Sequence, residues 1–252
     1  MSEHIYELPL NERLRTFMRV EFLYKRLQYS LENDDTWAIR SSVNTLLEIY
    51  SILSRTDVRR EVLFDLDRYI FQMTKYQGSS MVNKKRAKEI NLQLEGLKND
   101  VDQVGTGYLG QIRDIEFVSS LLHRHTLPGG RAEFDMPKYK FWLDSGPTRT
   151  RSDLRKWVGV IKPVCDSIDQ ILWLLRESSE AISTVAISGL YNHHVERNSQ
   201  ISLVRIFLSK NNVFPEISGG KHLISIRFLN WSITDEKTIQ DNKNIRFKIS
   251  LC

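Results

Sequence analysis

Residues 201–208 read ISLVRIFL, a pattern of period two that sets this part of the chain apart from everything before it. Alternation places Arg205 with Leu203 and Phe207 on one face of a strand. Residues 222–229 and 245–251 are also rich in β-branched and aromatic side chains, and residues 181–190 are a candidate fourth strand. Turn-forming residues separate these strands, notably FPEISGG at residues 214–220. We therefore expect a β domain here.

Upstream, the apolar period becomes helical. The residues that recur at this spacing are Leu14, Phe17, Val20, Leu23, Tyr24, Leu27 and Leu31. They predict a first helix that begins after Asn11, a suitable N-cap. A second helix is expected from about Asp35 to Ser54, and a third from near Asp57.

The third helix and the one after it have the spacing of an antiparallel hairpin. Apolar residues are spaced four and three apart from Val62 to Met73, and again from Ile90 to Val104. The residues QGSS at 77–80 provide a turn between the two helices. Packing within one chain explains these short seams, and a dimer seam is the alternative.

The rest of the helical region is less regular. We expect a helix over residues 111–125, a break at LPGG (residues 127–130), and an extended piece over 131–136. Residues 152–161 and 163–177 predict two helices, because proline is tolerated in a first helical turn and disfavoured inside a helix. The predicted fold class is α+β: an N-terminal all-helical domain (residues 1–180) followed by a small antiparallel β-sheet domain (181–252). Extended pieces at the N-terminus and at 131–136 are candidates to join the sheet.

Composition restricts the class of protein. The 252 residues are 41% hydrophobic, enough for a folded core, and no apolar run approaches the length that crosses a bilayer. No apolar segment follows a basic start, so no secretory signal is predicted. Two cysteines, Cys165 and Cys252, are too few for a disulfide framework. We expect a cytoplasmic protein without membrane insertion.

The charge is unevenly distributed along the chain. The net charge is +5, and residues 181–252 contribute about +4 of it, with nine basic against five acidic residues. This excess favours an acidic partner for the β domain, although a solvated basic surface explains it equally well.

No pattern of catalytic residues stands out. Residues 105–110, GTGYLG, match a dinucleotide fingerprint, but they follow a predicted helix and not the strand that this motif requires. His123 with His125, and His193 with His194, lack the further ligands of a zinc site. We expect neither an enzyme nor a cofactor or metal.

A nucleic-acid-binding β-sheet is the alternative function. Aromatic residues alternate with basic ones in the predicted strands, as in sheets that bind RNA. The aromatic residues are Phe207, Phe228, Trp231 and Phe247, and the basic ones are Arg205, Arg227, Arg246 and Lys248. No known RNA-binding motif is present, and a core position also explains such aromatic residues. Nucleic acid is therefore not the expected partner.

Several ordered segments resemble one family of bacterial proteins. They are LPLNERLRTFMRVEFL (8–23), SRTDVR (54–59), DLDR (65–68), LPGG (127–130), FDMP (134–137), WL (142–143), FPEISG (214–219) and IRF (226–228). Together they resemble the ZapD family over nearly the whole chain. The resemblance implies a dimeric cytoplasmic division factor. Such a factor would bind the C-terminal tail of the tubulin-like protein FtsZ and cross-link its filaments at the mid-cell division ring.

The resemblance also implies a basic site for the tail. Arg55, Lys221 and Arg227 match its pocket, Arg15 and Arg19 match basic positions of the first long helix, and Arg124 matches a later one. Lys140 keeps the charge where a relative has histidine. Leu223 and Glu116 stand where the family has further arginines, and His222 is a partial substitute for the first.

Overall fold

The structure is a computed structural model that describes residues 3–33, 35–77, 83–196, 199, 201–209, 212–220, 222–231 and 239–252. Its α+β class, with helices mainly before residue 180 and antiparallel strands after it, confirms the prediction. The chain forms two compact units. The strand unit comprises Met1–Arg15 and Trp173–Cys252, and the helical unit comprises Thr16–Leu172.

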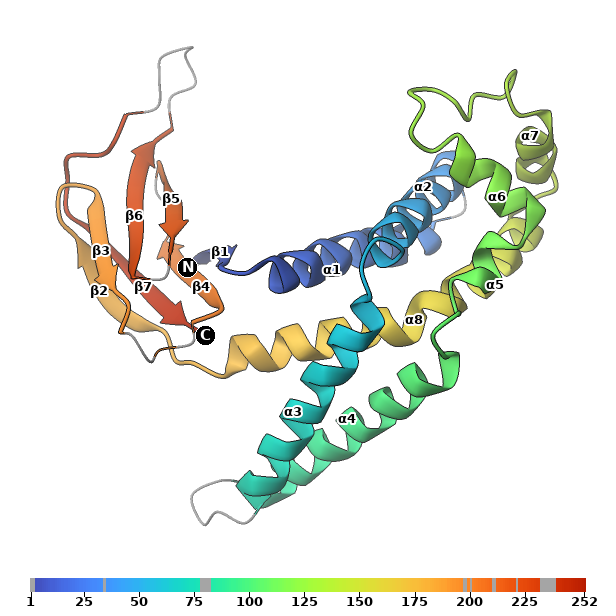
Figure 1. The fold of residues 1–252 in the computed structure, drawn as a ribbon. Coiled ribbons are helices and arrows are strands. Elements are labelled where there is room, and N and C mark those ends of the chain that lie inside the picture. Colours follow the sequence, from blue (N-terminus) through green and yellow to red (C-terminus); the bar gives the residue numbers. More distant parts are fainter. Residues whose placement is uncertain are drawn as a thin grey trace. The chain divides into compact units, whose positions relative to one another are not determined.

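Figure 1 shows the helices, most of whose residues belong to the helical unit. They are α1 (Glu12–Leu31), α2 (Thr36–Leu53), α3 (Val58–Gln77), α4 (Lys84–Val104), α5 (Gly110–Arg113), α6 (Glu116–His123), α7 (Pro137–Asp144) and α8 (Pro147–Glu177). The predicted cap of α1 is confirmed, because Asn11 Oδ1 accepts a hydrogen bond from the Leu14 amide at 2.8 Å. Asp35 caps α2 in the same way, through the amides of Trp37 and Ala38.

Helices α3 and α4 form the predicted antiparallel hairpin (Figure 1). Arg59 Nε donates to the carbonyl of Val101 at one end, and Lys98 pairs with Asp67 further along the hairpin. Leu66 and Leu94 are completely buried, as their seam positions predict. Of the predicted turn at 77–80, residues 78–80 lie outside the described residues.

Two predictions in the later helices are wrong. Residues 147–177 form one helix that contains Pro163, because buried Ile161 and Val164 lie on both sides of the proline. Their burial offsets the cost of the missing amide, which is about 3 kcal/mol. The predicted helix 111–125 is broken between α5 and α6. In a continuous helix Ile112 and Val118 would lie about 120° apart, and the break lets both be completely buried.

The expected extended piece at 131–136 is also wrong. The chain here coils into turns, in which the amides of Ala132 and Met136 donate to the carbonyls of Gly129 and Ala132. Gly129 has a φ of +68°, which glycine adopts without strain. Because these backbone groups are satisfied locally, the segment needs no partner strand.

The strand unit contains two antiparallel sheets with the orders β1-β4-β7-β2 and β3-β6-β5, where one was expected. The strands are β1 (Glu3–Pro9), β2 (Ile182–Ala186), β3 (Leu190–His194), β4 (Leu203–Ser209), β5 (Val213–Gly219), β6 (Leu223–Asn230) and β7 (Ile245–Leu251). The N-terminal segment joins the first sheet by pairing with β4. One apolar core includes side chains of both sheets, and Phe228 of β6 lies 5.0 Å from Phe247 of β7, ring to ring.

The predicted turn at residues 214–220 is also wrong, because residues 213–219 form strand β5. Pro215 lies opposite Phe228, and β5 is an edge strand of its sheet. An edge strand has a free side on which a missing amide breaks no ladder, so the proline is tolerated there.

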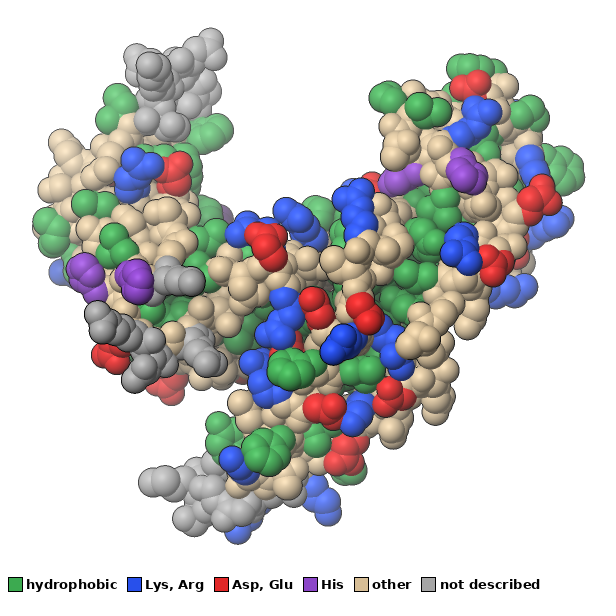
Figure 2. Space-filling view, viewed as in Figure 1, with side chains coloured by type: hydrophobic (Ala, Val, Ile, Leu, Met, Phe, Trp, Pro, Cys, Tyr) green, Lys and Arg blue, Asp and Glu red, His purple; other side chains and the backbone are tan. Residues whose placement is uncertain are grey.

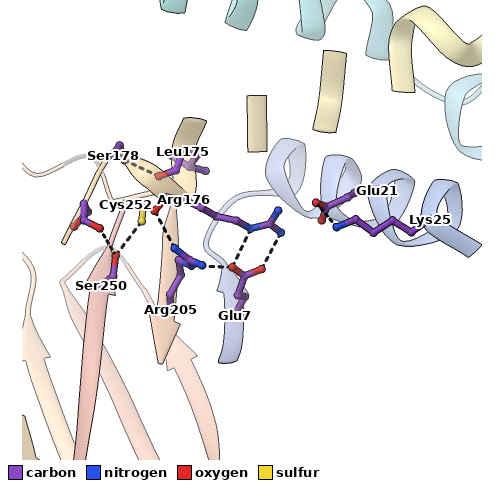
Figure 3. A network of polar contacts seen from close by, with 10 residues as sticks. Glu7, Glu21, Lys25, Leu175, Arg176, Ser178, Arg205, Ser250 and Cys252 are labelled. Carbon is purple, nitrogen blue, oxygen red and sulfur yellow. Dashed lines mark hydrogen bonds and ion pairs between the residues drawn. The ribbon is translucent and has the colours of Figure 1, made fainter. Parts of the chain in front are cut away.

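A partly buried ion network ties three elements of the strand unit together (Figure 3). Glu7 of β1 accepts two hydrogen bonds from Arg176, at the end of α8, at 3.0 and 2.9 Å. Arg205 of β4 donates to the same carboxylate at 2.9 Å and to the carbonyl of Arg176 at 2.9 Å. Arg205 therefore has a structural partner within its own unit.

Candidate functional site: a basic cavity in the helical unit

The loop between α2 and α3 exposes Arg55, one of the predicted site residues, to solvent. Helix α2 ends at Leu53, and the Ser54 amide closes its last turn by bonding to the carbonyls of Ile52 and Tyr50. Asp57 begins the next helix by accepting from the amide of Arg60 at 3.2 Å. Asp57 is two residues from Arg55, but the two side chains form no ion pair. Arg55 is exposed and has no side-chain partner among the described residues.

Arg55 lines a cavity of about 460 Å³ that lies entirely in the helical unit. The other lining residues are Tyr50, Leu53, Ser54, Thr56, Asp57, Val58, Arg59, Thr106, Gly107, Tyr108, Leu109, Gly110 and Arg113. Arg59 pairs with Asp102 at 3.2 Å, and Arg113 pairs with Asp114 at 3.1 Å. Arg55 is thus the lining arginine whose guanidinium is available, and it can bind an incoming carboxylate through two parallel hydrogen bonds.

The glycine-rich segment 105–110 forms one wall of this cavity. Gly105 ends α4 with a φ of +70°, which confirms the prediction that this segment follows a helix and not a strand. Tyr108, within this segment, is buried, and burial raises the pKa of its hydroxyl above the usual range. The sequence prediction missed these residues as part of a site, because only the fold brings them to Arg55.

The remaining predicted residues of the helical unit differ in their availability. Arg19 on α1 is exposed and has no side-chain partner among the residues that the structure describes. Arg124, at the end of α6, lies 3.8 Å from Asp135. Lys140 on α7 contacts Asp144 at 3.0 Å and Glu133 at 3.4 Å, and hydrogen bonds to these two carboxylates raise its pKa. Arg124 and Lys140 therefore already have acidic neighbours.

The strand unit holds another group of predicted residues. Arg227 on β6 is exposed and forms a cross-strand ion pair of 2.5 Å with Glu216 on β5. Arg15 donates to Glu12 Oε1 and to the carbonyl of Pro9, both at 3.2 Å. His222 is exposed at the start of β6, and Lys221 lies outside the described residues. The predicted residues thus fall into two groups, one on each unit.

Bulk charge does not mark a site on the helices. Figure 2 shows basic and acidic side chains intermixed over the helices on the face in view, without a large patch of one sign. Glu116, which stands where the resemblance implies an arginine in the family, pairs with Lys138 at 3.0 Å. Local geometry, such as the cavity at Arg55, therefore distinguishes a binding site better than net charge does.

The described residues show neither a metal cluster nor a membrane span. Within the described ranges, no group of three or more His, Cys, Asp and Glu side chains could hold a metal ion. No described helix is long and apolar enough to cross a membrane.

The fold and the cavity define an α+β protein with a helical unit, a strand unit and an accessible arginine in a surface cavity. Residues 18–227 match the family described as "ZapD: Cell division protein". The cell division protein ZapD of Methylococcus capsulatus is 32% identical over 253 residues, which cover 100% of this chain and 98% of that one. ZapD of Bordetella petrii is 33% identical and ZapD of Nitrosomonas eutropha 29%, each with 98% of both chains covered. The chain belongs to the ZapD family of cell division proteins.

Proposed function

We propose that this protein is a non-enzymatic division factor that binds the C-terminal tail of FtsZ. As a homodimer it would hold two tails and so cross-link FtsZ filaments into bundles at the mid-cell ring in the cytoplasm. Its family membership supports a role in division. The observation that carries the binding site is Arg55, an exposed guanidinium in a cavity, without a carboxylate partner among the described residues.

A flexible tail loses conformational entropy when it binds, so each tail site gains little net free energy. Charge-assisted hydrogen bonds between arginine and carboxylate return part of that loss. A weak single site suits a cross-linker, because two linked sites raise the overall affinity through effective concentration. A two-fold interface between two copies would supply the second site.

Arg227 should take part in tail binding only in competition with Glu216. The exposed ion pair between them stabilises the fold by at most about 1 kcal/mol, so a tail carboxylate can displace Glu216. We expect Glu216→Gln to raise the affinity for an FtsZ tail peptide roughly two- to five-fold, and Arg227→Ala to lower it. Fluorescence anisotropy with a labelled peptide measures both effects.

Glu180→Gln is the matched control, because it removes one exposed negative charge from the same unit with no described side-chain partner. If the two glutamate variants raise the affinity equally, the gain comes from net charge and Arg227 has no specific role. If Arg227→Ala binds the peptide normally, Arg227 is not part of the site.

Co-sedimentation with FtsZ filaments tests the proposed function as a whole. We expect the protein to pellet with wild-type filaments and not with tail-deleted ones. The bound fraction should fall as salt rises from roughly 50 to 300 mM, since the Debye length then shortens to well below 10 Å. Equal pelleting with both filaments, or binding only to added nucleic acid, would favour the nucleic-acid alternative. Bundling by a sample that light scattering shows to be monomeric would contradict the cross-linking dimer.

A further inference from the structure

A second cavity of the helical unit has a different construction. It has a volume of about 490 Å³ and is lined by residues of α1, α2, α7 and the turn that follows Leu127. Its polar side chains include Arg26, Arg40, Arg131 and Tyr139. We call it the Tyr139 pocket. Its size lies within the range of cavities that bind small molecules.

Three guanidinium groups line this pocket, and acidic partners are described for two of them. Arg26 pairs with Glu48 at 2.6 Å and also donates to Thr45 Oγ1 at 2.8 Å. Arg40 pairs with Glu133 at 2.5 Å. The two carboxylates therefore form ion pairs with two of the three guanidinium groups, and the third has no ion pair of its own among the described residues.

The third guanidinium group belongs to Arg131. The contact described for its side chain is with a histidine, since Arg131 Nη1 lies 3.1 Å from His125 Nδ1. An arginine can only donate, so His125 accepts at Nδ1. Burial and the nearby Arg131 lower the pKa of His125, which keeps the imidazole neutral at pH 7. Burial lowers the pKa of the half-buried Arg131, an effect that the nearby Glu48 opposes. An arginine nevertheless stays charged at neutral pH, and Arg131 has further N–H groups to donate.

Tyr139 adds a second, independent feature. The side chain is 1% exposed, and its hydroxyl has no hydrogen-bond partner among the described residues. An unpaired buried hydroxyl is destabilising, because it has lost its hydrogen bonds to water. Burial raises the pKa of Tyr139 to about 12 against the opposing effect of Arg40 and Arg131, so the group remains a donor at neutral pH. The hydroxyl is closed off from solvent, so an acceptor bound in the pocket would satisfy it after a small movement of the side chains around it.

We propose that the Tyr139 pocket binds a small free oxyanion ligand, through a carboxylate or phosphate group that accepts hydrogen bonds from Arg131 and Tyr139. Arg40 would help to attract the ligand, since its guanidinium carbon lies 5.3 Å from the centre of the Tyr139 ring. Trp37, which lines the pocket and is exposed, offers an apolar wall for the rest of the ligand. This site is separate from the cavity at Arg55 and goes beyond the proposed tail binding.

Isothermal titration of the full-length protein with inorganic phosphate and with citrate, at constant ionic strength, tests the proposal. We expect saturable binding of at least one of them, and Arg131→Gln should weaken it at least ten-fold. The matched control is Arg155→Gln, at an exposed arginine of α8 with no described side-chain partner, and it should bind like the wild type. Absence of binding for both anions, or equal loss in the two variants, would overturn the proposal.

Tyr139→Phe separates binding from folding. Loss of an unpaired buried hydroxyl should leave the melting temperature unchanged or raised, yet weaken anion binding several-fold. Normal anion affinity in this variant would overturn the role of Tyr139. Co-sedimentation with FtsZ should be unchanged in Tyr139→Phe, and anion binding should be unchanged in Arg55→Ala. The two variants therefore test the anion site and the tail site independently of each other. Binding of an acidic peptide, but of neither free anion, would also count against a free ligand.

Discussion

Replacing Glu7 by glutamine should lower the free energy of unfolding of the strand unit by about 2–3 kcal/mol. The carboxylate accepts from both Arg176 and Arg205, and all three side chains are less than one-fifth exposed. Without the negative charge, two mostly buried guanidinium groups would lose the carboxylate that they share. The neutral amide has nearly the same shape, so the loss reports charge and hydrogen bonding rather than packing.

Glu3→Gln is the control for this prediction. Glu3 lies on the same strand and pairs with Lys248 at 2.9 Å, but both side chains are at least 40% exposed. Solvent screens such a pair, and its loss should cost about 0–1 kcal/mol. Urea denaturation followed by circular dichroism, with hydrogen exchange of the β1 and β4 amides, measures both variants. Similar small losses in the two would show that the Glu7 network contributes no more than a surface pair.

Arg55→Ala should weaken binding of the FtsZ tail by about 1–3 kcal/mol, or roughly 5- to 150-fold. The guanidinium has no partner among the described residues, so its removal leaves no buried charge behind. The melting temperature should therefore not change. Filament bundling should decline more steeply than peptide binding, because both sites of a dimer lose affinity together.

Arg60→Ala provides the comparison, since it removes the same charge from an exposed position five residues away that does not line the cavity. Only a small loss is expected there, from weaker long-range attraction. If the two alanine variants lose tail affinity equally, the interaction is non-specific electrostatics. If Arg55→Ala binds normally while folded, the cavity is not the tail site.

Local patterns in the chain predicted its elements well where one periodicity was uninterrupted. The apolar spacing after Asn11 located α1, and alternation located β4, β6 and β7. The α3–α4 hairpin could also be predicted, because the two helices are consecutive in the chain and each has an apolar seam. Such features depend on which face of an element is apolar, and this can be read from neighbouring residues alone.

Packing overrode local propensity in the elements that were mispredicted. Pro163 predicts a helix start, yet burial on both sides keeps α8 continuous. Pro215 and the glycines after it predict a turn, yet an edge position in a sheet accepts them as β5. In each case long-range contacts outweigh a local preference of a few kcal/mol at most.

The candidate sites divide in the same way. Resemblance to a family proposed Arg55 and Arg227, but only the fold shows that the first is available and the second is paired with Glu216. Nothing in the sequence relates Glu7 to Arg176 and Arg205, or Arg131 to Tyr139 in a cavity. Periodicity acts between neighbouring residues and can be read along the chain. Ion pairs and cavities depend on distances between residues far apart in sequence, which are set when the helices and sheets pack.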